Sequence, residues 1–140
     1  MTEPNKNVKD LRTYRSLRSI KSLKIKKSTR ISRTHVIMDI YKCDERTLAK
    51  TQFLEQKIKK LLNEFQLEPK IKIFYQFQPF GVTAVVYSPG LQFTIHTWPE
   101  HQSAAIDLYS FKGRKAATQI CEQLQQIFKA GEYEMKVRRR

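Results

Sequence analysis

The 140-residue chain has few cysteines, few acidic residues and no long apolar run. Two cysteines, Cys43 and Cys121, are too few for a disulfide framework or for a zinc or iron–sulfur site. No apolar run approaches the ~18 residues that a membrane-spanning helix needs, and no apolar signal core stands near residue 1. We therefore expect a cytoplasmic protein without a metal site, a membrane span or a membrane partner.

Basic residues outnumber acidic ones, with 27 Lys and Arg against 13 Asp and Glu and a formal net charge of +14. The net charge is +9 over residues 1–34, +3 over residues 35–131 and +2 over residues 132–140. This distribution predicts a basic extended arm at 1–34, a folded domain at 35–131, and a last strand with a basic tip at 132–140. Blocks of like charge gain little by packing and usually act as interaction tails, so a polyanion is the expected partner.

The arm carries a basic residue at every third position from residue 12 to residue 33. We expect this arm to be extended or partly helical and to become ordered when it binds RNA. The predicted RNA-binding residues lie in the arm or the tip: Arg12, Arg15, Arg18, Lys21, Lys24, Lys26, Lys27, Arg30, Arg33, Arg138, Arg139 and Arg140. Three other interpretations of the arm are a mitochondrial transit peptide, a segment lying on an anionic membrane, and a solvated tail without function.

Apolar periodicity predicts an α/β fold for the rest of the chain. Alternation predicts strands at His35–Tyr41, Lys70–Gln78, Val82–Tyr87, Leu91–Thr97, Ala104–Ser110 and Tyr133–Val137. Helical spacing predicts helices at Asp44–Gln66, with Asp44 as the N-cap, and at Arg114–Lys129, with Gly131 ending the second. The order β-α-β-β-β-β-α-β is consistent with a two-layer sandwich, an antiparallel sheet with helices on one face.

One segment is much more specific than this periodicity. Thr94–Glu100 (TIHTWPE), followed by Ala104–Ser110 (AAIDLYS), resembles the bacterial-type S-adenosylmethionine decarboxylase family. His35–Tyr41 and Gly81–Val86 are also similar to that family, and the resemblance covers roughly residues 34–130. It implies a two-layer α/β sandwich that is commonly paired across a twofold axis.

The resemblance also implies a chemistry that this chain has lost. Family enzymes cleave themselves at a Glu–Ser bond, and the serine becomes a pyruvoyl group that forms a Schiff base with the substrate amine. Gly90 and Leu91 stand at the Glu–Ser positions here, and Phe111 stands at the position of the family's proton-donating cysteine. Leucine has no hydroxyl to attack the preceding carbonyl, so of the three chemical positions only His96 remains.

We therefore expect no cofactor, no catalytic residue and no enzymatic activity, and His96 is interpreted as a structural histidine. A three-residue shift within the hairpin would instead bring Ser88 to the position of the reactive serine. Leu91 and Phe111 are expected to fill part of any small-molecule pocket that remains at the old active site.

Two classes of function are compatible with these features. The first is a non-catalytic RNA-binding protein, namely a ribosomal protein or ribosome-associated factor whose partners are ribosomal RNA and neighbouring ribosomal proteins. The alternative is an inactive paralogue that pairs with an active S-adenosylmethionine decarboxylase and regulates it in polyamine synthesis, and a homodimer is also open. A DNA-binding protein ranks lower because no groove-reading helix is visible.

Overall fold

The computed structural model describes residues 33–140. The predicted arm therefore lies outside the described residues except at its last two positions, and so do its predicted RNA-binding residues from Arg12 to Arg30. In the described part, no helix is long and apolar enough to cross a membrane.

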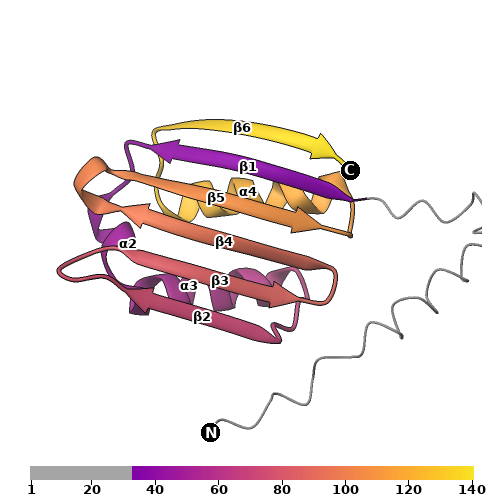
Figure 1. Ribbon diagram of the computed structural model, residues 1–140, viewed down its shortest axis with the longest axis horizontal. Coiled ribbons are helices and arrows are strands. Elements are labelled where there is room, and N and C mark those ends of the chain that lie inside the picture. The colour runs from indigo at the N-terminus through magenta and orange to yellow at the C-terminus, as the bar shows by residue number, and fades with distance from the viewer. Residues whose placement is uncertain (1–32) are drawn as a thin grey trace, which may run out of the picture. The chain divides into compact units, whose positions relative to one another are not determined.

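Six strands form one antiparallel sheet in the order β2-β3-β4-β5-β1-β6 (Figure 1). The strands are β1 (Thr34–Tyr41), β2 (Ile71–Gln76), β3 (Val82–Ser88), β4 (Leu91–Trp98), β5 (Ser103–Ser110) and β6 (Glu132–Arg139). The helices are α2 (Glu45–Ala49), α3 (Thr51–Glu64) and α4 (Arg114–Ile127), with a short 3-10 helix η2 at Pro99–His101. The predicted fold class is confirmed, with helices packed on an antiparallel sheet.

The predicted helix at Asp44–Gln66 differs from the structure, because the chain breaks it at Lys50. Lys50 has extended backbone angles, φ −129° and ψ 140°, between α2 and α3. The predicted N-cap is confirmed: the Asp44 carboxylate accepts the backbone N–H of Arg46 at 3.0 Å. The break is set by contacts with residues far along the chain, which local periodicity does not report.

The core lies between the helices and one face of the sheet. On β4, Leu91, Phe93 and Ile95 are buried at alternate positions, because successive strand side chains point to opposite faces. Leu54, Ile58 and Leu61 of α3 and Ile120 and Leu124 of α4 pack against this face. Each such side chain contributes about 1.5–3 kcal/mol by leaving water.

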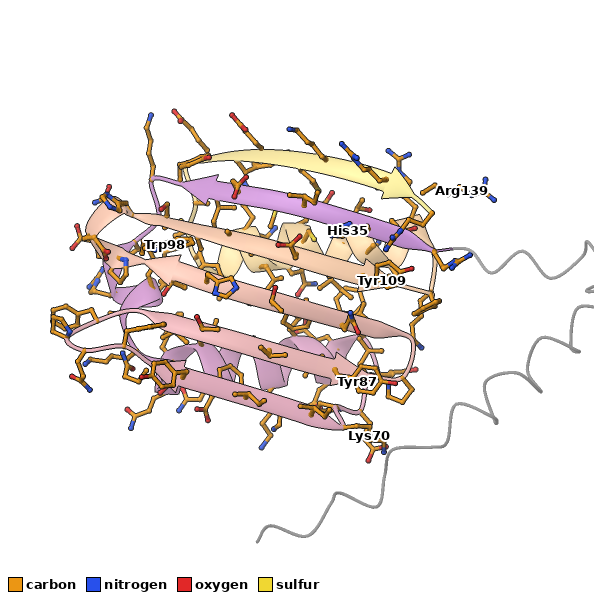
Figure 2. The ribbon with its side chains drawn as sticks, in the orientation of Figure 1. His35, Lys70, Tyr87, Trp98, Tyr109 and Arg139 are labelled. Carbon is orange, nitrogen blue, oxygen red and sulfur yellow. The ribbon has the colours of Figure 1, made fainter. Side chains whose placement is uncertain are left out.

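No helix of the described chain covers the other face of the sheet, which we call the open face (Figure 1). Directly paired residues on adjacent strands share a face, so the open face consists of cross-strand rows. The register gives three rows: Ile71–Tyr87–Gln92–Tyr109–His35–Arg138, Ile73–Val85–Thr94–Asp107–Ile37–Lys136, and Tyr75–Thr83–His96–Ala105–Asp39–Glu134. Figure 2 labels three residues of the first row, His35, Tyr87 and Tyr109, on the side of the sheet that faces the viewer.

Candidate functional site

His96 lies in a hollow on the open face. Its ring Nδ1 is 2.9 Å from the hydroxyl of Thr83, its direct partner on β3. The hollow has a volume of about 320 Å³, and it is lined by residues that include Phe77, Phe80, Thr83, His96, Trp98 and Glu100. We call it the His96 hollow. It combines a hydrogen-bonded imidazole and a carboxylate with three aromatic rings, a set that suits a ligand with a flat apolar part and polar groups.

Thr97, the residue after His96, points to the opposite face and fixes this part of β4 in place. Its buried hydroxyl donates to the carbonyl of Leu48 at 2.7 Å and accepts the N–H of Val82 at 2.8 Å. One side chain therefore joins the end of α2 to the beginning of β3 beneath the hollow. Because the hydroxyl has partners on both sides, its burial leaves no polar atom unsatisfied.

Position 91, where the resemblance places the pyruvoyl-forming serine, lies in the core of this chain. Leu91 is the first residue of β4 and only 2% exposed, with its side chain in the core. Gly90 precedes it in the turn with φ +90°, a conformation that favours glycine over glutamate. No hydroxyl is present to attack the Gly90 carbonyl, so these residues do not fit a pyruvoyl group formed there.

Two serines lie next to Leu91 in the sheet, and both are engaged in other hydrogen bonds. Leu91 pairs with Ser88 on β3 and with Ser110 on β5. The Ser88 hydroxyl is buried and donates to the carbonyl of Glu68 at 2.9 Å. The Ser110 oxygen accepts the N–H of Lys112 at 3.0 Å. Both serine hydroxyls are therefore occupied by hydrogen bonds to backbone groups.

Leu91 and Phe111 do not line the His96 hollow, contrary to our expectation that they fill the old pocket. Phe111 is 48% exposed after the end of β5 and packs edge-on against Tyr109, with ring centroids 5.1 Å apart. The Phe111 side chain is therefore exposed, and it contacts the Tyr109 ring of β5.

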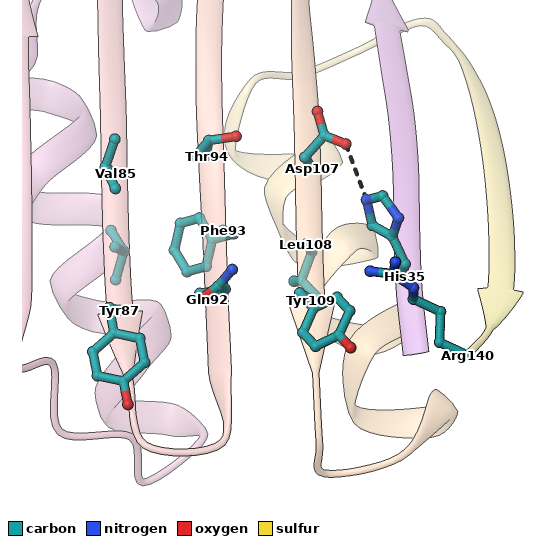
Figure 3. Close-up of a pocket in the computed structure, with 11 residues that line it drawn as sticks. His35, Val85, Tyr87, Gln92, Phe93, Thr94, Asp107, Leu108, Tyr109 and Arg140 are labelled. Atoms are coloured by element: carbon teal, nitrogen blue, oxygen red, sulfur yellow. Dashed lines mark hydrogen bonds and ion pairs between the residues drawn. The ribbon is translucent and has the colours of Figure 1, made fainter. Parts of the chain in front are cut away.

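A second hollow of about 340 Å³ lies on the open face near the ends of β3 and β5 (Figure 3). Tyr87 and Tyr109 stand on either side of Gln92 in one cross-strand row. His35 Nε2 is 3.1 Å from the carboxylate of Asp107, and the Arg140 guanidinium lies 5.9 Å from the Tyr109 ring centroid. Sequence patterns do not predict this grouping, because it depends on the register of strands β3, β4, β5 and β1.

The described members of the predicted RNA-binding set lie together. Arg33 precedes β1, Arg138 and Arg139 end the neighbouring strand β6, and Arg140 follows them. The backbone N–H of Arg140 donates to the carbonyl of Arg33 at 2.9 Å. Strand pairing therefore brings the start of the domain and the basic tip to one end of the sheet.

Both thiols are buried in the core and lack nucleophilic character. Burial raises the pKa of the Cys43 thiol to about 11 and that of the Cys121 thiol to about 12. At neutral pH both are protonated, whereas the reactive form of cysteine is the thiolate. Across residues 33–140 no group of three or more His, Cys, Asp or Glu side chains could hold a metal ion.

The family model described as S-adenosylmethionine decarboxylase matches residues 34–140. The chain belongs to this family. It is 31% identical over 96 residues to the S-adenosylmethionine decarboxylase proenzyme of Caldicellulosiruptor saccharolyticus, covering 69% of this chain and 77% of that protein.

Two further comparisons place the similarity in the folded domain. The proenzyme of Thermotoga maritima is 38% identical over 76 residues, covering 54% of this chain and 58% of that protein, so the match spans less than two thirds of that relative. The crystal structure of adenosylmethionine decarboxylase from Aquifex aeolicus VF5 superposes with a TM-score of 0.71 at 24% identity, covering 77% of this chain and 89% of that one. This superposition shows a shared fold.

These findings correct the predicted function. The prediction of a ribosomal or ribosome-associated RNA-binding protein is wrong, because the relatives are decarboxylase proenzymes and nothing among them points to ribosomal RNA. The prediction that the chain is not an enzyme is wrong for the same reason, since its family is one of enzymes. The predicted family, read from the segment around His96, is confirmed.

Proposed function

We propose that this chain is a subunit of an S-adenosylmethionine decarboxylase and that it pairs with a family member carrying the pyruvoyl group. In this arrangement the reactive carbonyl comes from the partner, because position 91 of this chain is a buried leucine. We propose that this complex acts in polyamine synthesis, in the cytoplasm. One observation carries the proposal: the hollow around His96 is formed, but the residue at position 91 is a leucine, which has no hydroxyl.

The open face supports pairing because large apolar side chains are exposed on it. Ile73 is 54% exposed, Tyr75 is 59% exposed, and Tyr87 and Trp98 are each about 40% exposed. Apolar groups collected on one face of a soluble domain mark an interaction surface. A stable interface needs about 800 Å² from each partner, an area that a six-stranded sheet face can supply.

The charges on the open face suit the rim of such an interface. The half formed by β5, β1 and β6 carries Asp107, Asp39, Glu134, Lys136 and Arg138. Most of the exposed large apolar residues of this face, apart from Tyr41 of β1, lie on β2, β3 and β4. Protein interfaces commonly combine an apolar core with a polar rim. The His96 hollow lies in the apolar half, so a partner seated there would exclude water from His96 and Thr83.

The test uses the full chain and a family member from the same organism that carries the Glu–Ser pair and the cysteine. The two are purified separately and mixed, and the release of carbon dioxide from S-adenosylmethionine is measured with the size of the complex. We expect a stoichiometric complex whose kcat or KM differs several-fold from that of the partner alone. Decarboxylation by this chain alone, or no association between the two proteins, would overturn the proposal.

A further inference from the structure

One wall of the His96 hollow is hydrogen-bonded to the chain where α2 ends and α3 begins, around Lys50. The wall is the Phe77–Gly81 loop between β2 and β3, which contributes Phe77 and Phe80 to the hollow. The carbonyl of Ala49, the last residue of α2, accepts the N–H of Gly81 at 3.1 Å and the Nε2 group of Gln76 at 2.9 Å. The N–H of Thr51, the first residue of α3, donates to Gln76 Oε1 at 3.0 Å.

Gln76 also contacts the loop itself. Its Nε2 group lies 3.0 Å from the carbonyl of Phe77 and 3.0 Å from that of Gly81. With Ala49 included, three carbonyls surround one NH2 group that carries two hydrogens, so this donor is fully used. One side chain at the end of β2 therefore joins the helix break to both ends of the loop.

Lys50 makes a second connection at the break. Its ammonium group donates to the carbonyl of Pro79 at 3.2 Å and lies 4.9 Å from the centroid of the Phe80 ring. This contact is exposed to water, and it is weaker than a set of partly buried hydrogen bonds. The hydrogen bonds of Gln76 therefore hold the loop more strongly than the contacts of Lys50 do.

The break in the helix follows from this arrangement. In a continuous helix the Ala49 carbonyl would accept the N–H of Phe53, and the N–H of Thr51 would donate to the Thr47 carbonyl. Both groups are instead used by Gln76, and Ala49 also receives Gly81. Because the backbone is extended at Lys50, the Ala49 carbonyl and the Thr51 N–H form hydrogen bonds that hold the loop and do not form helical ones.

We propose that Gln76 is a positioning residue for the His96 hollow: it holds the Phe77–Gly81 loop at the helix break and thereby sets the distance between the aromatic wall and His96. This proposal rests on the proposed function for its kinetic consequence, which is the affinity of the paired enzyme for S-adenosylmethionine. The structural part of the proposal, namely that Gln76 holds the loop, does not depend on any partner. Gln76 itself does not line the hollow, so it acts through Phe77 and Phe80.

The structural part is tested by amide hydrogen exchange in Gln76→Leu, Gln76→Glu and a matched control, Gln119→Leu, whose side chain is exposed on α4. Leucine removes all polar contacts, whereas glutamate keeps an acceptor for Thr51. We expect the Thr51 amide to exchange about tenfold faster or more in Gln76→Leu but to remain protected in Gln76→Glu. We expect Gly81 to exchange faster in both Gln76 variants, with no change in the control.

Unchanged exchange at Thr51 and Gly81 in Gln76→Leu would overturn the proposal. If Gln76→Leu does not fold, Gln76→Glu carries the test through Gly81. Trp98, the single tryptophan, lies in the same hollow, so its fluorescence should also change in the Gln76 variants and not in the control.

The kinetic part uses the complex with the pyruvoyl-carrying partner. We expect Gln76→Leu to raise KM for S-adenosylmethionine several-fold with kcat nearly unchanged, and Gln76→Glu to recover part of the loss. A fall in kcat alone, or no change in either constant, would contradict a positioning role. If this chain does not associate with the pyruvoyl-carrying partner, the proposed function fails, while the exchange data still decide the role of Gln76.

Discussion

Leu91 and His96 lie on the same strand, β4, and their side chains point to opposite faces of the sheet. Leu91 is 2% exposed among core residues, whereas His96 stands on the open face beside Thr83. Their separation of five positions is odd, and odd separations along a strand place side chains on opposite faces. Position 91 is therefore part of the core in this chain, and His96 remains part of an accessible hollow.

Replacing Leu91 with serine should destabilise the fold and should not restore a reactive centre. Leu91→Ser loses the burial of a large side chain, leaves a cavity and places a hydroxyl among apolar groups, which together cost about 2–5 kcal/mol. Denaturant unfolding measures this loss, and the exposed neighbour Gln92→Ser should stay within about 0.5 kcal/mol of the native chain. A Leu91→Ser chain that is as stable as the native one and cleaves itself would contradict this account.

Replacing Ile73 should weaken pairing without weakening the domain. Ile73 lies on the open face and is 54% exposed, so Ile73→Gln should leave the free energy of unfolding nearly unchanged. In the complex it would place an amide in the apolar part of the interface, and we expect the Kd for the partner to rise about tenfold, which corresponds to about 1.4 kcal/mol. Lys72→Gln, one residue away on the other face, is the control and should bind as the native chain does. Equal Kd values for both variants would mean that the partner binds elsewhere.

The two thiols should react slowly in the folded chain. Burial raises the pKa of Cys43 to about 11 and that of Cys121 to about 12, so at pH 8 almost no thiolate is present at either position. A chromogenic disulfide reagent should label both groups at the rate of unfolding, and label them fast in denaturant. Rapid labelling of one thiol under native conditions would show an accessible, activated cysteine that this structure does not contain.

Asp44 should make the stability of the domain depend on acid pH. The hydrogen bonds that its carboxylate accepts from Arg46 lower its pKa in the folded state below the ordinary value. A depressed folded pKa means that the contribution is present above the unfolded pKa of about 3.9 and is lost as the pH falls through the folded value.

Substitutions at position 44 separate the charge from the cap. Asp44→Asn retains an N-cap oxygen and should remove this part of the acid dependence, whereas Asp44→Ala should lose the cap as well. Thermal unfolding measured between pH 2 and pH 6 distinguishes the two variants. Identical pH profiles for the native chain and Asp44→Asn would show that another carboxylate is responsible.

Periodicity was sufficient for the order of strands and helices because each strand has one buried face, and that pattern is local. The sequence did not show the interruption at Lys50, since the groups that replace the helical bonds come from Gln76 and Gly81. An amphipathic pattern continues through such a break, because α2 and α3 both pack on the same side of the sheet. The boundary between them is a tertiary feature.

The candidate site was only partly predictable. His96 and Glu100 both belong to the motif Thr94–Glu100, but Thr83 joins them through strand register and Phe77 through the loop between β2 and β3. Alternation along β4 shows that Gln92, Thr94 and His96 share a face, but it does not tell which residues of other strands meet them. The strongest feature of the composition, its positive charge, led to a wrong function because charge reports a class of partner and not a reaction.

The most direct test of the central claim is the denaturing mass spectrum of the complex isolated after this chain and its pyruvoyl-carrying partner are produced together. The account predicts this chain uncleaved at its full mass of 16.6 kDa, together with the two fragments of a processed partner. Fragments of this chain generated by cleavage before residue 91, or at Ser88, would contradict it, because the pyruvoyl group would then come from this subunit.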